Sequence, residues 1–187
     1  MNIRIARLDD AKRLLDIYGY YVINTAVSFE YEVPSVEEFE QRIKNISSRY
    51  PYLKAVNENG EILGYAYAGT FKDRAAYDWS VESTIYLKMD SRRKGFGKAL
   101  YEALEASLRE IGILNVNACI AVPKKEDKYL TMDSIYFHEK MGYAPVGTFH
   151  DSGYKFRTWY DMIWMEKMLG EHTETAEPVR FGEWSLA

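Results

Sequence analysis

A chain of 187 residues with 47% hydrophobic and 28% charged residues is long enough to bury a sizeable core and suits one globular domain. A net charge of -4 argues against nucleic acid as the main partner. The single cysteine rules out an intrachain disulfide, and neither a signal peptide nor a bilayer-spanning stretch is visible, so the sequence predicts a cytoplasmic protein outside the membrane.

Alternating apolar and polar residues at 3–7 predict a first strand. Asp9 or Asp10 is then expected to cap a helix, because a carboxylate at this position accepts hydrogen bonds from free backbone N–H groups. The apolar positions of that helix are Ala11, Leu14, Leu15, Ile17, Tyr18 and Tyr21. Residues 24–33 are expected to be extended or loop-like.

A second helix and a hairpin follow. Ser35 and Glu38 form a capping box that predicts the start of the helix, which should end before the proline at position 51. Residues 53–56 and 62–68 read as two strands, and the Asn-Gly pair at 59–60 predicts the tight turn between them.

The centre of the chain predicts a strand at residues 79–88, a long helix that stops at Gly112, and a strand at 115–122. Because a single helix joins the two strands, we expect them to be parallel with a right-handed crossover. Alternation places Glu82 and Thr84 on one face of the first of these strands.

The remaining sequence predicts an exposed loop at 123–130, a helix at 132–141 and two antiparallel strands at 143–150 and 158–169. We therefore expect one domain over residues 1–169. Residues 170–187 read as an acidic tail, partly disordered, whose apolar residues could dock on the domain. Those residues are Phe181, Trp184 and Leu186.

A basic, glycine-containing turn precedes the long helix. It consists of Arg92, Arg93, Lys94, Gly95, Phe96, Gly97 and Lys98. Free N–H groups and the positive end of the dipole at a helix N-terminus favour phosphate, and glycine lets phosphate approach the backbone. The spacing differs from the Walker loop and from the three-glycine dinucleotide fingerprint. From these residues alone, a phosphate site and an ordinary turn with a solvated basic rim both remain open.

The pattern Arg-x-x-Gly-x-Gly between a strand and a helix resembles the pyrophosphate loop of the GNAT acyltransferases, which bind acetyl-CoA. The predicted order β-α-α-β-β-β-α-β-α-β-β is also the order of that family. The resemblance covers about residues 3–169 and implies the α/β (α+β) GNAT fold. In this fold a twisted, mixed and mostly antiparallel sheet, with its fourth and fifth strands parallel, is flanked by helices.

Within the family, several stretches resemble the phosphinothricin acetyltransferase branch, namely residues 49–53, 64–69, 76–86 and 138–145. The block at 76–86 is long and unusual, which makes it more specific than the glycine turn. The resemblance implies a homodimeric, acetyl-CoA-dependent N-acetyltransferase acting on the α-amino group of phosphinothricin or of methionine sulfone or sulfoximine. The chain has Thr131 where many GNAT proteins have Asn, and His138 where many have Tyr; the branch shares the His.

Acetyl transfer needs a base, because an ammonium has no lone pair, and donors for the developing oxyanion. By position, Glu82 is the predicted base, acting through water; otherwise it is a solvated carboxylate or pairs with Arg74. The backbone N–H groups around Tyr86 and Leu87 are the predicted oxyanion donors. The resemblance places His138 near the CoA sulfur, where it would protonate the thiolate or, in place of Glu82, act as the base; a lone histidine on a helix is otherwise usually structural.

The resemblance also assigns the two binding sites. The residues predicted to bind acetyl-CoA are Tyr86, Leu87, Lys88, Arg92, Arg93, Lys94, Gly95, Phe96, Gly97, Lys98 and Ser134. Those predicted to bind the acceptor are Phe29, Tyr67, Lys72, Arg74, Tyr77, Thr84 and Val122. Lys72 and Arg74 would hold an acceptor carboxylate or be surface charges. The aromatic residues would line the acceptor pocket or pack in the core.

No metal site is predicted, because the three histidines and one cysteine show no ligand spacing. Cys119 lies in an apolar run and is expected to be a buried structural thiol. The 16 tyrosines suggest a tyrosine-lined pocket, an aromatic interface or a tyrosine-rich core. Two other functions remain open: acetylation of a protein N-terminus or a polyamine, and non-catalytic sensing of acyl-CoA.

Overall fold

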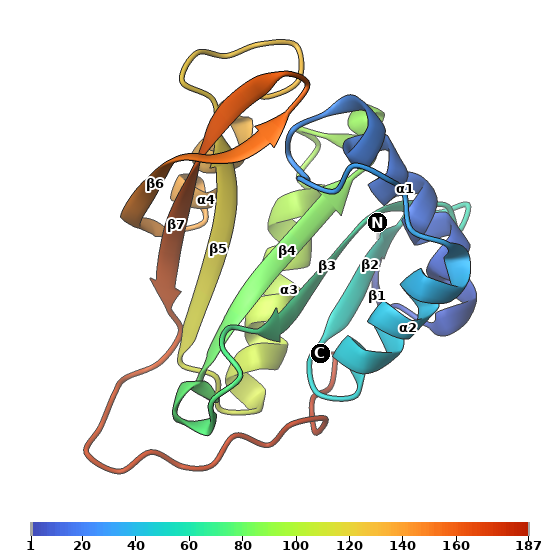
Figure 1. Cartoon of the computed structure of the whole chain (residues 1–187). Coiled ribbons are helices and arrows are strands. Elements are labelled where there is room, and N and C mark those ends of the chain that lie inside the picture. Colours follow the sequence, from blue (N-terminus) through green and yellow to red (C-terminus); the bar gives the residue numbers. More distant parts are fainter. Residues whose placement is uncertain (1, 187) are drawn as a thin grey trace.

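The computed structural model describes residues 2–186. A seven-stranded sheet has the order β1-β2-β3-β4-β5-β7-β6. The strands are β1 (Asn2–Ile5), β2 (Tyr52–Val56), β3 (Ile62–Thr70), β4 (Ser80–Leu87), β5 (Asn115–Val122), β6 (Ala144–Lys155) and β7 (Thr158–Met168). The α-helices are α1 (Ala11–Asn24), α2 (Val36–Ser47), α3 (Phe96–Glu110) and α4 (Asp133–Lys140). Their order along the chain confirms the predicted one (Figure 1).

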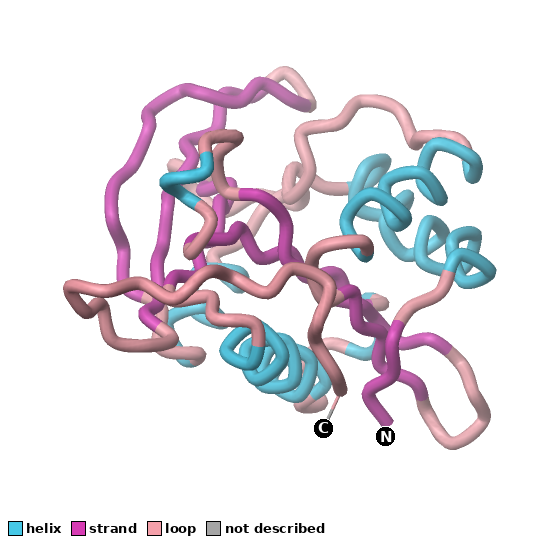
Figure 2. Tube along the Cα trace, turned by 90° about the horizontal axis from the view of Figure 1, so that it is seen from below, coloured by secondary structure: helices cyan, strands magenta, loops and turns pink. Residues whose placement is uncertain are grey.

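Helices cover both faces of the sheet, and the strand period of two decides which side chains each face buries. On one face, Leu14 of α1 and Ile43 of α2 belong to the same buried cluster as Tyr65 of β3. On the other face, Leu104 of α3 clusters with Val81 of β4. Figure 2 shows the sheet between these helical layers.

β4 and β5 are parallel, as predicted, but they pair at one end only. The ladder begins at Ser80 opposite Asn115 and ends at Glu82 opposite Asn117. Beyond Glu82 the two strands diverge, and Figure 1 shows them spreading apart toward the end of β4. The sheet is therefore open in its middle, next to the start of the glycine turn.

Local signals account for most element boundaries. Ser35 begins α2 as predicted, because its side-chain oxygen accepts a hydrogen bond from the Glu38 N–H at 3.1 Å. Asp10 precedes α1, but its carboxylate accepts a hydrogen bond from the Arg7 N–H and makes no side-chain cap. β6 is longer than predicted, because the register shifts between Phe149 and Gly153 and the strand continues beyond this irregularity.

The end of the C-terminal segment packs on the domain. Its apolar residues Val179, Phe181, Trp184 and Leu186 lie against the buried cluster that contains α3. The Arg49 guanidinium lies 4.0 Å from the centre of the Phe181 ring, a cation–π contact. These apolar residues dock on the domain, the possibility that the sequence left open, whereas residues 170–178 are exposed.

Among residues 2–186, no helix has both the length and the apolar composition that a membrane span requires. Within the same residues, no group of three or more His, Cys, Asp or Glu side chains is arranged to hold a metal ion.

Candidate active site

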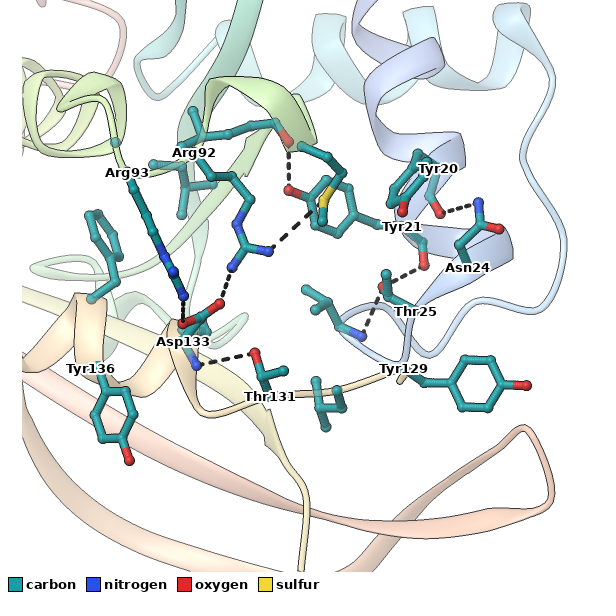
Figure 3. Close-up of a pocket in the computed structure, with 18 of the residues that line it drawn as sticks. Tyr20, Tyr21, Asn24, Thr25, Arg92, Arg93, Tyr129, Thr131, Asp133 and Tyr136 are labelled. Atoms are coloured by element: carbon teal, nitrogen blue, oxygen red, sulfur yellow. Dashed lines mark hydrogen bonds and ion pairs between the residues drawn. The ribbon is translucent and has the colours of Figure 1, made fainter. Parts of the chain in front are cut away.

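A cavity of about 880 Å³ lies at the divergence of β4 and β5. One side is lined by Leu87, Gly97 and Phe137, and the opposite side by the last turn of α1 and the loop after it. Figure 3 shows Tyr20, Tyr21, Asn24 and Thr25 on that second side. The basic lining residues are Arg92, Arg93, Lys98, Lys128 and Lys140. The cavity is therefore suited to an anionic ligand.

The glycine turn shapes the N-terminus of α3 at this cavity. Gly95 has φ +86°, a left-handed conformation that an L side chain adopts only with strain. Gly97 is buried, and an added Cβ would lie 3.1 Å from the Phe137 ring. Because the first N–H groups of a helix have no intrahelical partner, this end of α3 presents donors and a positive dipole to the cavity.

Arg92 and Arg93 share one carboxylate across the cavity wall. Their guanidinium groups donate to the two oxygens of Asp133, on α4, at 2.8 and 2.9 Å (Figure 3). Burial alone would raise the pKa of Asp133, but its bonds with the two arginines hold it below its ordinary value. Asp133 therefore holds both guanidinium groups at one point of the cavity wall.

The predicted cofactor residues divide into two groups. Those that line the cavity are Leu87, Arg92, Arg93, Gly95, Gly97, Lys98 and Ser134. The Tyr86 side chain packs instead among the aromatic rings of the α1 face, 5.0 Å from Tyr18 between ring centres. Lys88 pairs with Glu61, Lys94 is exposed, and Phe96 borders a separate depression. Side-chain contact with a ligand in the cavity is not expected for these four.

Glu82 sits where the β4–β5 ladder ends. Its side chain is half-buried, and desolvation raises its pKa above the ordinary value, with the charge of Lys72 opposing the shift. On neighbouring strands, Tyr67 of β3 is directly opposite Thr84 of β4. Glu82, Thr84 and Tyr67 therefore form one polar group on the face away from α3.

The other predicted acceptor residues lie on several different elements. The Lys72 ammonium lies 5.4 Å from the centre of the Trp164 ring on β7. Phe29 packs near Tyr160, with ring centres 6.4 Å apart. Arg74 and Tyr77 are exposed on the loop after β3, and Val122 ends β5. Lys72 is the basic residue of this set whose charge reaches Glu82.

The backbone of β4 offers one donor to the cavity. The Lys88 N–H bonds to the Leu63 oxygen of β3 at 2.8 Å. Since N–H groups alternate in direction along an antiparallel pair, the Tyr86 N–H also points to β3, and the Leu87 N–H points toward the opening. The Tyr21 hydroxyl bonds to the Leu87 oxygen at 2.5 Å, as this alternation requires. The geometry therefore favours Leu87 over Tyr86 as an oxyanion donor.

His138 lies inside the protein, 3% exposed, and is absent from the residues that line the cavity. Nδ1 lies 2.7 Å from the Ser134 oxygen, which can only accept, so Nδ1 carries the proton. Nε2 therefore accepts from the Tyr101 hydroxyl at 2.9 Å. Burial lowers the pKa of His138 to about 4, so the ring is neutral at physiological pH. Both nitrogens are engaged, which does not support the predicted contact with the CoA sulfur.

The buried histidine predicts a pH-dependent stability. An unfolded histidine binds its proton near pH 6.5 and the folded one near pH 4, so the free energy of unfolding should fall as pH decreases between these values. The loss should be about 2 kcal/mol at pH 5. Urea unfolding at neutral pH and at about pH 5 should show a smaller decrease for His138→Gln than for the original protein. Equal decreases in both proteins would contradict the buried neutral ring.

The sequence did not indicate that Cys119 lies on the face of the sheet that carries Glu82. Cys119 is exposed, so the expectation of a buried thiol is wrong. Val116 and Ala118 face the core below α3, and alternation turns Cys119 to the opposite face, where it lies opposite Trp164 in the β5–β7 ladder. Partial burial and the charge of Glu82 raise the pKa of Cys119 to about 11, so it remains a neutral thiol.

Comparisons with known proteins agree with this geometry. The sequence profile of the acetyltransferase (GNAT) domain matches residues 3–164. The chain is 36% identical to the phosphinothricin N-acetyltransferase of Streptomyces viridochromogenes, over 87% of this chain and 84% of that protein. It is 31% identical to the L-methionine sulfoximine/L-methionine sulfone acetyltransferase of Pseudomonas aeruginosa, over 90% of this chain and 94% of that protein.

A solved structure gives the same assignment. The phosphinothricin acetyltransferase of Sinorhizobium meliloti, in complex with acetyl-CoA, superposes with a TM-score of 0.85 at 33% identity, covering 96% of this chain and 93% of that one. The fold and the cavity therefore define an acyl-CoA-dependent transferase architecture. The chain belongs to the GNAT acetyltransferase family, and within it to the phosphinothricin acetyltransferase-like branch, which confirms the resemblance seen in the sequence.

Proposed function

We propose that this protein transfers the acetyl group of acetyl-CoA to the α-amino group of a small amino-acid-like acceptor. One observation supports this most directly: the basic cavity at the N-terminus of α3 is lined by Ile85 and Leu87, in the part of β4 that no longer pairs with β5. The N-terminus of α3 and the basic residues suit the CoA phosphates. The opening would then place the thioester near the base and the Leu87 N–H.

In the proposed mechanism, Glu82 takes a proton from the acceptor ammonium through water, and its raised pKa suits this role. The free amine attacks the thioester carbon while the Leu87 N–H stabilises the oxyanion. Collapse of the tetrahedral intermediate breaks the carbon–sulfur bond and releases the CoA thiolate, and the nitrogen loses its second proton to solvent to give the amide. Because His138 is buried and neutral, we propose that solvent supplies the proton to the thiolate.

The proposed acceptor is a phosphinothricin-like or methionine sulfone- or sulfoximine-like amino acid, as the names of the relatives suggest. Lys72 would pair with an acidic group of the acceptor, and Arg74 would join it if the loop after β3 closes. Tyr67 and Thr84 would contact the acceptor beside Glu82, while Phe29, Tyr77 and Val122 would lie around them. A polyamine would favour acidic residues where Lys72 lies, and a sensor would need no base.

The test is thiol release from acetyl-CoA with a panel of amino acids, peptides and polyamines. We expect turnover with phosphinothricin, methionine sulfone or methionine sulfoximine well above that with the other amines. Turnover confined to peptides or to polyamines would reject the proposed acceptor class. CoA binding without turnover of any amine in the panel would favour the sensor.

We further propose a cytoplasmic homodimer, with residues 1–169 as the catalytic domain and 170–187 as a tail that supports it. Val146 and Phe149 on the edge strand β6 and Trp159 on β7 are more than half exposed, and a second copy could cover them. Sedimentation at micromolar concentration should give the dimer mass. Monomer mass under these conditions would contradict this assembly.

A further inference from the structure

The turn between β6 and β7, at Phe156 and Arg157, reaches two loops that form the wall of the cavity. We call residues 25–31 the first wall loop and residues 123–131 the second wall loop. Thr25 and Val27 of the first and Tyr129 of the second line the cavity. Figure 1 shows the β6–β7 hairpin bending over the sheet toward the segment that follows α1.

Lys155 connects this hairpin to the first wall loop. Its side chain is 3% exposed, and its ammonium donates to the Val22 oxygen at 2.7 Å and to the Ser28 oxygen at 2.6 Å. Val22 lies in the last turn of α1, whose carbonyls lack helical partners and carry partial negative charge. A buried ammonium is unfavourable unless its donors are bonded. One cation therefore holds the end of α1 and the first wall loop in place.

Aromatic contacts join the same turn to both loops. The Phe156 ring stacks on Tyr129 of the second wall loop, with ring centres 3.9 Å apart and planes at 6°. The two loops are joined in turn, because the Ala26 N–H donates to the Tyr129 oxygen at 3.0 Å. The Phe29 ring lies so close to Gly153 of β6 that an added Cβ would be 2.1 Å from it.

The backbone of the turn is strained where these contacts occur. Phe156 and Arg157 have φ of 50° and 62°, in the left-handed region where Asn and Gly are usual in such turns. The stacking of Phe156 on Tyr129 offsets this strain and keeps the turn against the loop.

We propose that Lys155 is a positioning residue for acetyl transfer: it holds the first wall loop, and with it Phe29, in the geometry that receives the acceptor. The kinetic part of this inference rests on the proposed function. Lys155 has no contact with the cavity and acts through the loop. Loss of the Lys155 ammonium should therefore weaken acceptor binding more than it slows acetyl transfer, because the groups proposed to act in that step, Glu82 and the Leu87 N–H, lie on β4.

The test compares Lys155→Met, which keeps the apolar stem and removes the ammonium, with Lys12→Met. Lys12 is an exposed lysine that pairs with Asp16 at 3.2 Å, outside both wall loops and the hairpin, and serves as the control. In Lys155→Met, amide hydrogen exchange at residues 25–31 should accelerate by about 10-fold or more, while the exchange of β4 stays unchanged. The acceptor KM should rise by roughly 10-fold with kcat within about threefold, and the control should change neither.

Unchanged exchange at residues 25–31 would overturn the inference, as would faster exchange with unchanged KM. If Lys155→Met does not fold, Lys155→Gln keeps two N–H donors and should show smaller changes in the same directions. If the original protein acetylates no amine, the proposed function fails. The exchange comparison would still show whether Lys155 holds the loop.

Discussion

Replacing Glu82 by glutamine is expected to lower turnover by about 10² to 10⁴ at neutral pH, the range that loss of a general base produces. Glutamine keeps the shape of the side chain and removes the group that accepts the proton. The affinity for CoA should change little, because Glu82 is not among the residues that line the cavity. Steady-state kinetics with saturating acceptor, together with calorimetry of CoA binding, would measure both effects.

The pH dependence gives a sharper test of the same substitution. Burial raises the pKa of Glu82, and the base works only when ionised, so the rate of the original protein should fall as pH decreases through this raised pKa. In Glu82→Gln this acidic decline should flatten, and alkaline pH should restore part of the rate, because more acceptor is then free amine. Glu166→Gln is a matched control. Glu166 of β7 is paired with Asn117 of β5, which is itself paired with Glu82, so both carboxylates lie on the same face of the sheet.

The competing hypothesis is that His138, and not Glu82, is the base. If His138 is the base, His138→Ala should lose turnover at every pH and Glu82→Gln should not. The buried ring and its two hydrogen bonds predict instead that His138→Ala mainly loses stability. Full activity of Glu82→Gln beside an inactive, folded His138→Ala would show that the base is assigned to the wrong residue.

Replacing Gly97 by valine is expected to weaken CoA binding by about 10- to 1,000-fold, the worth of one or two charge-assisted hydrogen bonds. A Cβ at this position would lie 3.1 Å from the Phe137 ring and 3.5 Å from Leu87 Cδ1, and both residues line the cavity. The branched side chain must therefore push these walls apart and move the N-terminal N–H groups of α3 away from the phosphates.

Calorimetry of CoA with the folded variant measures this effect, and circular dichroism checks the fold. Gly147→Val is the matched control, because no atom lies within 4 Å of an added Cβ at Gly147 on the edge strand. Gly97→Ala should give a smaller loss in the same direction. CoA affinity that is unchanged in a folded Gly97→Val protein would remove the glycine turn from its proposed role.

Much of this protein is determined locally in its sequence. The Ser35–Glu38 pair begins a helix, and alternation along residues 79–88 separates the buried Val81 from the half-buried Glu82. The glycine turn lies between a strand and a helix. Together with the block at 76–86, this position is specific enough to indicate the family. These features depend on neighbours a few residues apart, so backbone geometry and side-chain period are sufficient to predict them.

Other features follow only from how distant segments meet. His138 is neutral because the fold buries it, next to Tyr101 of another helix, and Asp133 reaches Arg92 from 41 positions along the chain. The ammonium of Lys155 bonds to carbonyl oxygens that lie 133 and 127 positions earlier in the chain. A charged or polar side chain in the sequence shows what it can bind, but not whether it is buried or which partner it meets. Burial and the choice of partner depend on strand order, on the separation of β4 from β5 and on which helix covers each face. Because these are relations between distant segments, only the tertiary structure decided them.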